Sequence, residues 1–169
     1  MAITAHTYRF TCRLKTDALL PGYLGSTLRG SLGWALKRLS CPLSRQVCKD
    51  CRLWGQCAYA WFFETEMYRD GESRSSNARP HPFILQPGVV TIGRSSPGSR
   101  FQFSLQLLDR ANELLPQIVY AVKMMGRSGI GSGRKQGLGR LWLNRLSQAR
   151  RCCIPTMREF CGCRSMTGG

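Results

Sequence analysis

The order in which two hydrophobic periodicities follow one another constrains the fold of this chain most. Residues 7–14, TYRFTCRL, alternate apolar and polar side chains with the period of two that is typical of a half-buried strand. Residues 24–40 instead carry leucines at helical spacing, and Pro116 falls in the first turn of a second helical segment, where proline is tolerated. The expected elements are a strand at 7–14, a helix at 24–40, strands at 82–94 and 100–108, a helix at 111–125 and a strand at 138–146.

The order strand, helix, strand, strand, helix, strand is that of the ferredoxin-like split arrangement, in which two helices cover one face of an antiparallel sheet. We therefore expect an α+β, ferredoxin-like (RRM-like) domain over residues 1–146. A cysteine-rich insertion at 41–57 interrupts it, and residues 147–169, which lack periodicity, are interpreted as a basic tail.

The charge balance predicts an anionic partner, because 25 Lys and Arg residues oppose 9 Asp and Glu and leave a net charge of +16. Arginine dominates the second half of the chain, which favours nucleic acid over the alternative of an acidic protein. The opening residues hold no apolar run of signal-peptide length, and no stretch is long enough to span a membrane. We expect a soluble, cytoplasmic protein without a membrane partner.

Four cysteines, spaced C-x6-C-x2-C-x5-C, fall within 17 residues of each other, and such a set can surround one tetrahedral zinc ion. Four protein ligands leave no position for water, so the predicted role of the zinc is structural. Arg45, Lys49 and Arg52 lie nearby and would favour thiolates. Buried free thiols and an iron–sulfur cluster remain alternatives. The predicted ligands are Cys41, Cys48, Cys51 and Cys57; incidental thiols are expected at Cys152, Cys153, Cys161 and Cys163.

Residues 126–139, GRSGIGSGRKQGLG, form a glycine-rich segment between the second helix and the last strand. Lys135 follows Arg134 and not glycine, so the P-loop pattern fails, and the dinucleotide pattern lacks its final glycine; we expect no nucleotide cofactor. Flexible backbone with three cations suits a sugar–phosphate chain, with N–H groups forming anion nests. Gly30 and Gly33 inside the first helix indicate close approach of another backbone or a ligand.

Several segments in this order resemble the RAMP superfamily of CRISPR-associated proteins over about residues 8–143. They are LPGYLGSTLRGSLGWALKRL, CAYAWFFET, PHPFILQPG and GRSGIGSGRKQGLGRL. The likeness is greatest to the endoribonuclease that processes precursor crRNA, and it implies a ferredoxin-like domain that recognises the CRISPR repeat RNA. In such enzymes a 2′-hydroxyl attacks the adjacent phosphate without a metal ion, helped by a general base that is often histidine. Family members commonly have a second ferredoxin-like domain, where this chain has its cysteine- and arginine-rich tail.

The resemblance also implies site residues. The glycine-rich loop and the start of the first helix would contact RNA, and His81, held between two prolines, is the candidate general base, with turn formation as its alternative role. The expected RNA-binding residues are Ser26, Arg29, Arg127, Gly129, Gly131, Gly133, Arg134, Lys135, Gly137 and Gly139. Arg29 is alternatively a solvated helix charge, and His6 is expected to be uninvolved.

Three functions are therefore open. The first is an RNA endonuclease that matures crRNA, and the second is a non-catalytic crRNA-binding subunit that assembles with other CRISPR effector subunits. The third is a small zinc-containing basic protein that binds other RNA or DNA.

Overall fold

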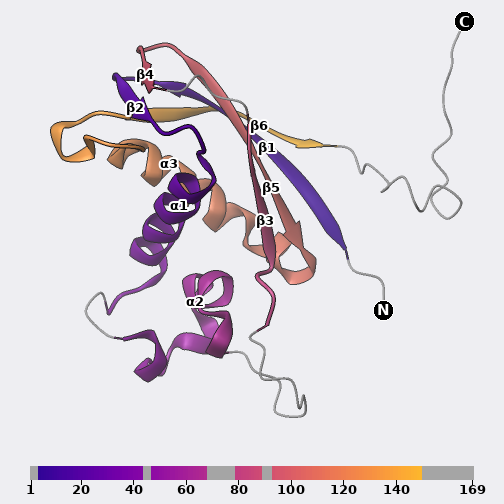
Figure 1. Cartoon of the computed structure of the whole chain (residues 1–169). Coiled ribbons are helices and arrows are strands. Elements are labelled where there is room, and N and C mark those ends of the chain that lie inside the picture. The colour runs from indigo at the N-terminus through magenta and orange to yellow at the C-terminus, as the bar shows by residue number, and fades with distance from the viewer. Residues whose placement is uncertain (1–3, 44–46, 68–78, 89–92, 150–169) are drawn as a thin grey trace, which may run out of the picture.

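A four-stranded antiparallel sheet organises the fold (Figure 1). The computed structural model describes residues 4–43, 47–67, 79–88 and 93–149. The strand order is β3-β5-β1-β6, so the first and last strands of the domain are neighbours. These strands are β1 (Ala5–Leu14), β3 (Phe83–Pro87), β5 (Arg100–Leu108) and β6 (Leu141–Ala149). This is the strand order and connectivity of the ferredoxin-like arrangement that the sequence predicts.

Two helices, α1 (Gly25–Ser40) and α3 (Leu115–Ser128), cover one face of the sheet and pack against each other (Figure 1). The leucine face of α1 is buried, except that Leu39 stays 36% exposed. The segment before α3 forms a 3₁₀ helix, Asp109–Leu114, so the α-helix begins later than predicted, with Pro116 in its first turn. A short helix, α2 (Ala58–Phe63), packs on α1, and its Phe62 lies in the core.

Two features differ from the expected layout. Strands β2 (Ala18–Leu20) and β4 (Gly93–Ser95) form a separate two-stranded sheet that the sequence did not predict, because three residues are too few for a pattern. The strand predicted over 82–94 is wrong in its extent, since β3 ends at Pro87 and Gly93 and Arg94 pair with β2 instead. Strand β6 continues to Ala149, past the predicted boundary at 146, because its antiparallel pairing with β1 continues to Thr7. The predicted tail from residue 150 onward, with its four cysteines, lies outside the described residues. Short 3₁₀ turns occupy Cys48–Asp50, Trp54–Gln56, Thr65–Met67 and Arg134–Gln136.

The centre of the core is a pair of stacked aromatic rings on adjacent strands. Phe10 of β1 lies opposite Phe103 of β5, with ring centroids 5.0 Å apart and planes 4° from parallel. Both rings are buried beneath the helices, while Arg9 and Arg13 project from the opposite, exposed face. The alternation of residues 7–14 is confirmed. No helix in the described part of the chain is long and apolar enough to cross a membrane.

Replacing Phe10 with alanine should lower the free energy of unfolding by about 3–5 kcal/mol, because it removes a fully buried aromatic ring and leaves a cavity beside Phe103. Urea denaturation followed by circular dichroism measures this loss. The neighbouring variant Arg9→Ala, on the exposed face, should change it by no more than about 0.5 kcal/mol. Equal losses for the two variants would contradict this description of the sheet.

Candidate functional site

The glycine-rich loop and the first turns of α1 line one open groove of about 620 Å³. Figure 1 shows the loop, in orange, beside β2 and the start of α1. The structure thus brings together two segments that are about a hundred residues apart in the sequence and that the resemblance singles out. The lining residues are Pro21, Ser26, Thr27, Gly30, Ser31, Trp34, Gly131, Ser132 and Arg134.

The loop is held in place by backbone contacts with the segment around β2. Ser132 N–H donates to the carbonyl oxygen of Leu19 (3.2 Å), and Gly139 N–H donates to that of Asp17 (2.7 Å). Gly131 and Gly139 have φ of +77° and +70°, and a Cβ there would collide with the carbonyl oxygens of Leu19 and Ile130. Glycine is required at both positions by conformation and by space. The predicted glycine-rich segment is therefore an anchored loop, and not a linker.

Most of the loop's own N–H groups are used inside the protein. Besides Ser132 and Gly139, those of Ile130, Gln136, Gly137 and Leu138 donate to loop carbonyls. These six N–H groups are therefore not available to an anion, because the loop folds back on itself and against the segment around β2. What it presents to the groove is the side chains of Ser132 and Arg134. Lys135 and Arg127 are exposed but do not line the groove, and Arg127 lies in the last turn of α3.

The two glycines inside α1 have different roles. A Cβ on Gly33 would lie 3.1 Å from the ring of Phe63, so this glycine allows α2 to pack closely. A Cβ on Gly30 would meet nothing within 4 Å, and Gly30 lines the groove. Close packing therefore does not require glycine at position 30, and this residue forms part of the groove wall. The lining contains one cation, several hydroxyl groups and no carboxylate, which suits a phosphate-containing ligand.

Arg29, predicted to bind phosphate or to be a solvated helix charge, is half-buried and has partners inside the protein. His81 Nδ1 lies 3.0 Å from the carbonyl oxygen of Phe62, which can only accept, so Nδ1 carries the hydrogen. Nε2 then accepts from the Arg29 guanidinium at 2.8 Å. That guanidinium also lies over the rings of Phe63 and Phe83, 5.6 and 5.2 Å from their centroids. Arg29 is thus directed toward α2 and β3, and neither it nor His81 lines the groove.

The second histidine of the chain lies at the start of β1. His6 Nδ1 is 2.7 Å from the amide nitrogen of Gln148 on β6, from which it accepts a hydrogen bond. It does not line the groove either. The expectation that His6 is uninvolved in the site stays a prediction.

The four predicted metal ligands surround one small cavity between the end of α1 and the start of α2, with Trp54 and Tyr59 also in its wall. All four cysteines are free thiols, and the described residues contain no group of three or more His, Cys, Asp or Glu already arranged to hold a metal ion. Burial raises the pKa of Cys48, whereas Lys37, which donates a hydrogen bond to it, lowers that pKa.

Lys37 is the cation that the sequence prediction missed in this segment. Lys49 and Arg52 are exposed, and Arg45 lies outside the described residues. Helical spacing places Lys37 one turn before Cys41, but its approach to Cys48 depends on the tertiary fold.

The fold and the groove define a ferredoxin-like domain with a phosphate-compatible site between its glycine-rich loop and its first helix. The family AF_1859_N, described as an N-terminal domain, matches residues 3–151. The chain belongs to this family. No curated protein matches it in sequence.

Solved structures share the fold at low sequence identity. A chain of the Csm3-Csm4 subcomplex in the type III-A CRISPR-Cas interference complex is 18% identical, with a TM-score of 0.57, over 85% of this chain and 77% of that one. A chain of a Type IV-B CRISPR complex is 11% identical with a TM-score of 0.53, over 88% and 94%. A chain of the Type III-B Cmr-beta complex bound to cognate target RNA is 12% identical with a TM-score of 0.51, over 86% and 61%.

These similarities support the resemblance to the RAMP superfamily at the level of the fold. None of the three structures bears on the precursor-processing endoribonuclease in particular.

The two types of glycine in the site predict opposite effects of alanine. Gly139→Ala should lower the free energy of unfolding by about 1–3 kcal/mol. Alanine disfavours the left-handed backbone at this position, and its Cβ would collide with Ile130. Gly30→Ala should stabilise it by about 0.5–1 kcal/mol, since it lies in an exposed helix interior with free space. Chemical denaturation of both variants measures these changes, and a stable Gly139→Ala protein would contradict the anchored loop.

Proposed function

We propose that this chain is an RNA-binding subunit of a CRISPR effector complex, and that it holds crRNA in the groove between the glycine-rich loop and α1 without cutting it. The observation that carries this proposal is the groove itself. It joins the two segments that the RAMP resemblance assigns to RNA, and Arg134 with the hydroxyl groups of Ser26, Thr27 and Ser132 offers donors to phosphate oxygens.

Charge and fold support the same proposal. A net charge of +16 favours a polyanionic ligand. The fold is shared with chains of three CRISPR complexes, one of them bound to target RNA. An assembly partner among other CRISPR subunits is therefore part of the proposal.

A precursor-processing endoribonuclease is the second candidate, with His81 as its general base. A base needs a free lone pair within reach of the 2′-hydroxyl. The Nε2 lone pair of His81 is held by Arg29, and the ring lies away from the groove. The geometry therefore favours a positioning role for His81, between α1, α2 and β3, and the non-catalytic subunit is the function we propose.

Removing the cations of the loop should weaken RNA binding, and it should also make the affinity for RNA less dependent on salt concentration. For Arg134→Ala/Lys135→Ala, the slope of log affinity against log salt should fall in magnitude by at least about 0.7, the value lost per phosphate contact with a single strand, because Arg134 lines the groove. Fluorescence anisotropy with labelled repeat RNA measures the slope. Arg9→Ala/Arg145→Ala removes the same charge from the exposed sheet face and is the matched control. An equal loss in the control would mean that net charge alone, and not the groove, binds RNA.

The same protein should leave precursor RNA intact. End-labelled RNA containing the repeat, incubated with protein whose binding has been shown by anisotropy, should migrate unchanged on a denaturing gel. A product ending in a 2′,3′-cyclic phosphate, absent with His81→Ala, would instead establish the endoribonuclease.

We also propose that Cys41, Cys48, Cys51 and Cys57 hold a structural zinc ion. Two observations support this proposal. All four cysteines line one cavity, and four sulfur donors form a ligand set that zinc prefers. Zinc would tie the 3₁₀ turns of this segment to the ends of α1 and α2. Burial disfavours the Cys48 thiolate and Lys37 favours it, and zinc binding would supply the further positive charge that displaces the thiol proton.

Metal analysis of purified protein should find about one zinc ion per chain, and a chelator should lower its melting temperature. Cys51→Ser should lose the metal. The control Cys12→Ala removes a thiol from the sheet core, where burial raises its pKa to about 12, and should keep the metal. Stoichiometric iron would favour the cluster alternative, and the absence of both metals would leave free thiols.

A further inference from the structure

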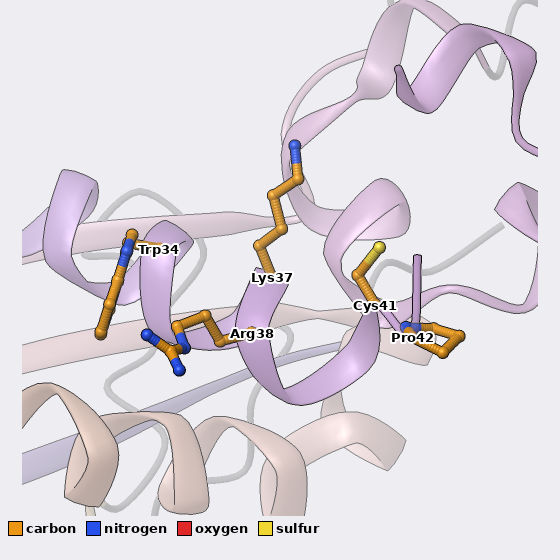
Figure 2. A pocket seen from close by; sticks show the side chains of 5 residues that line it. All are labelled: Trp34, Lys37, Arg38, Cys41 and Pro42. Carbon is orange, nitrogen blue, oxygen red and sulfur yellow. The ribbon is translucent and has the colours of Figure 1, made fainter. Parts of the chain in front are cut away.

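Trp34 lies where two hollows on the surface of α1 meet. It lines the groove beside the glycine-rich loop and also a second hollow of about 650 Å³, whose other lining residues are Lys37, Arg38, Cys41 and Pro42. Figure 2 shows these side chains around the second half of α1, with Arg38 directed toward Trp34. The two hollows therefore form one path along the helix, from the glycine-rich loop to the first cysteine. At 1.5 Å per residue, the span from Ser26 to Cys41 is about 22 Å.

The indole at this junction is exposed and accompanied by cations. The Trp34 residue is 41% exposed, and the Arg38 guanidinium carbon lies 5.0 Å from its ring centroid. Lys37, the next cation along the path, has its Nζ 5.0 Å from the ring centroid of Tyr59. With Arg134 at the other end, cations stand on both sides of the indole, and neither hollow is lined by a carboxylate.

A positively charged track interrupted by an accessible aromatic ring is the arrangement with which proteins bind single-stranded nucleic acid. The cations follow the phosphates, and an unpaired base stacks on the ring. Duplex RNA cannot use such a ring, because its bases are already stacked on one another. An apolar protein partner is less suited to this surface, since docking would bury two or three cations without opposite charges.

We propose that single-stranded RNA runs along α1 and that Trp34 stacks against one of its unpaired bases, with phosphates held by Arg134 on one side and by Arg38 and Lys37 on the other. This inference rests on the proposed function, which it deepens by adding a path and a contact with a base. In this proposal Trp34 makes the protein prefer single-stranded to duplex RNA, which the cations alone would not do.

The chain contains a matched control for this tryptophan. Trp142, on β6, lies on the exposed face of the sheet and is 50% exposed, and Lys15 Nζ lies 4.7 Å from its ring centroid. It has the same chemistry as Trp34, with a cation over its ring, but it lines neither hollow. The two residues therefore separate the effect of an exposed tryptophan from the effect of its place on α1.

The test uses fluorescence anisotropy with a labelled single-stranded RNA of about 12 nucleotides. Trp34→Ala should weaken binding about 5- to 150-fold, the range found when a stacking residue is removed. Trp34→Phe should retain most of the affinity, and Trp142→Ala should bind like the unchanged protein. An abasic strand of the same length should bind the unchanged protein and Trp34→Ala alike, because it has phosphates and no base to stack. Circular dichroism melting confirms that each variant is folded.

The outcomes separate this inference from the proposed function. If Arg134→Ala/Lys135→Ala weakens binding but Trp34→Ala does not, the path along α1 is overturned and the proposed function stands. If Trp34→Ala weakens binding of the abasic strand as much as that of the normal strand, or Trp142→Ala weakens binding equally, stacking on Trp34 is overturned. If the unchanged protein binds no RNA, both proposals fail, and a protein partner captured through Trp34 would then explain the exposed ring.

Discussion

The functional side of this molecule depends on the close approach of two backbones, where the glycine-rich loop meets the segment around β2. Two hydrogen bonds, from Ser132 to Leu19 and from Gly139 to Asp17, hold the loop there. The missing Cβ of Gly131 allows the approach to Leu19, and that of Gly139 allows the loop to close on its own Ile130. The loop in turn supplies one wall of the groove, while α1 supplies the other. Without this contact Arg134 would remain on the chain, but it would not line the groove beside the helix.

The architecture could be predicted from the sequence because its longer elements have clear periodicity. The alternation of residues 7–14 and the leucine spacing of residues 24–40 both describe side chains buried on one face, and burial is what the structure shows there. Short elements gave no such signal. Strands β2 and β4 contain three residues each and are stabilised by pairing with each other, which depends on the tertiary fold and not on local pattern.

The candidate site was predictable only in part, for a related reason. The glycines of the loop and Ser26 belong to segments whose backbone conformation can be inferred from residue types, and Gly131 and Ser26 among them line the groove. The direction of a long side chain depends instead on partners far away in the sequence. Arg29 is held by His81 and by two phenylalanine rings, and Lys37 approaches Cys48, so neither orientation could be deduced from neighbouring residues.

The pairing of β6 with β1 has a consequence for the order of events during synthesis. Strand β1 and helix α1 leave the ribosome early, whereas the glycine-rich loop and β6 are made more than a hundred residues later. One wall of the groove is therefore missing from every nascent chain until residues 126–149 have emerged. Strands that are far apart in the sequence also pair slowly, because the chain between them loses conformational entropy before the stabilising contacts form. A growing chain thus carries its basic helix without the finished binding surface, and the groove is available to a ligand only at the end of translation of this domain.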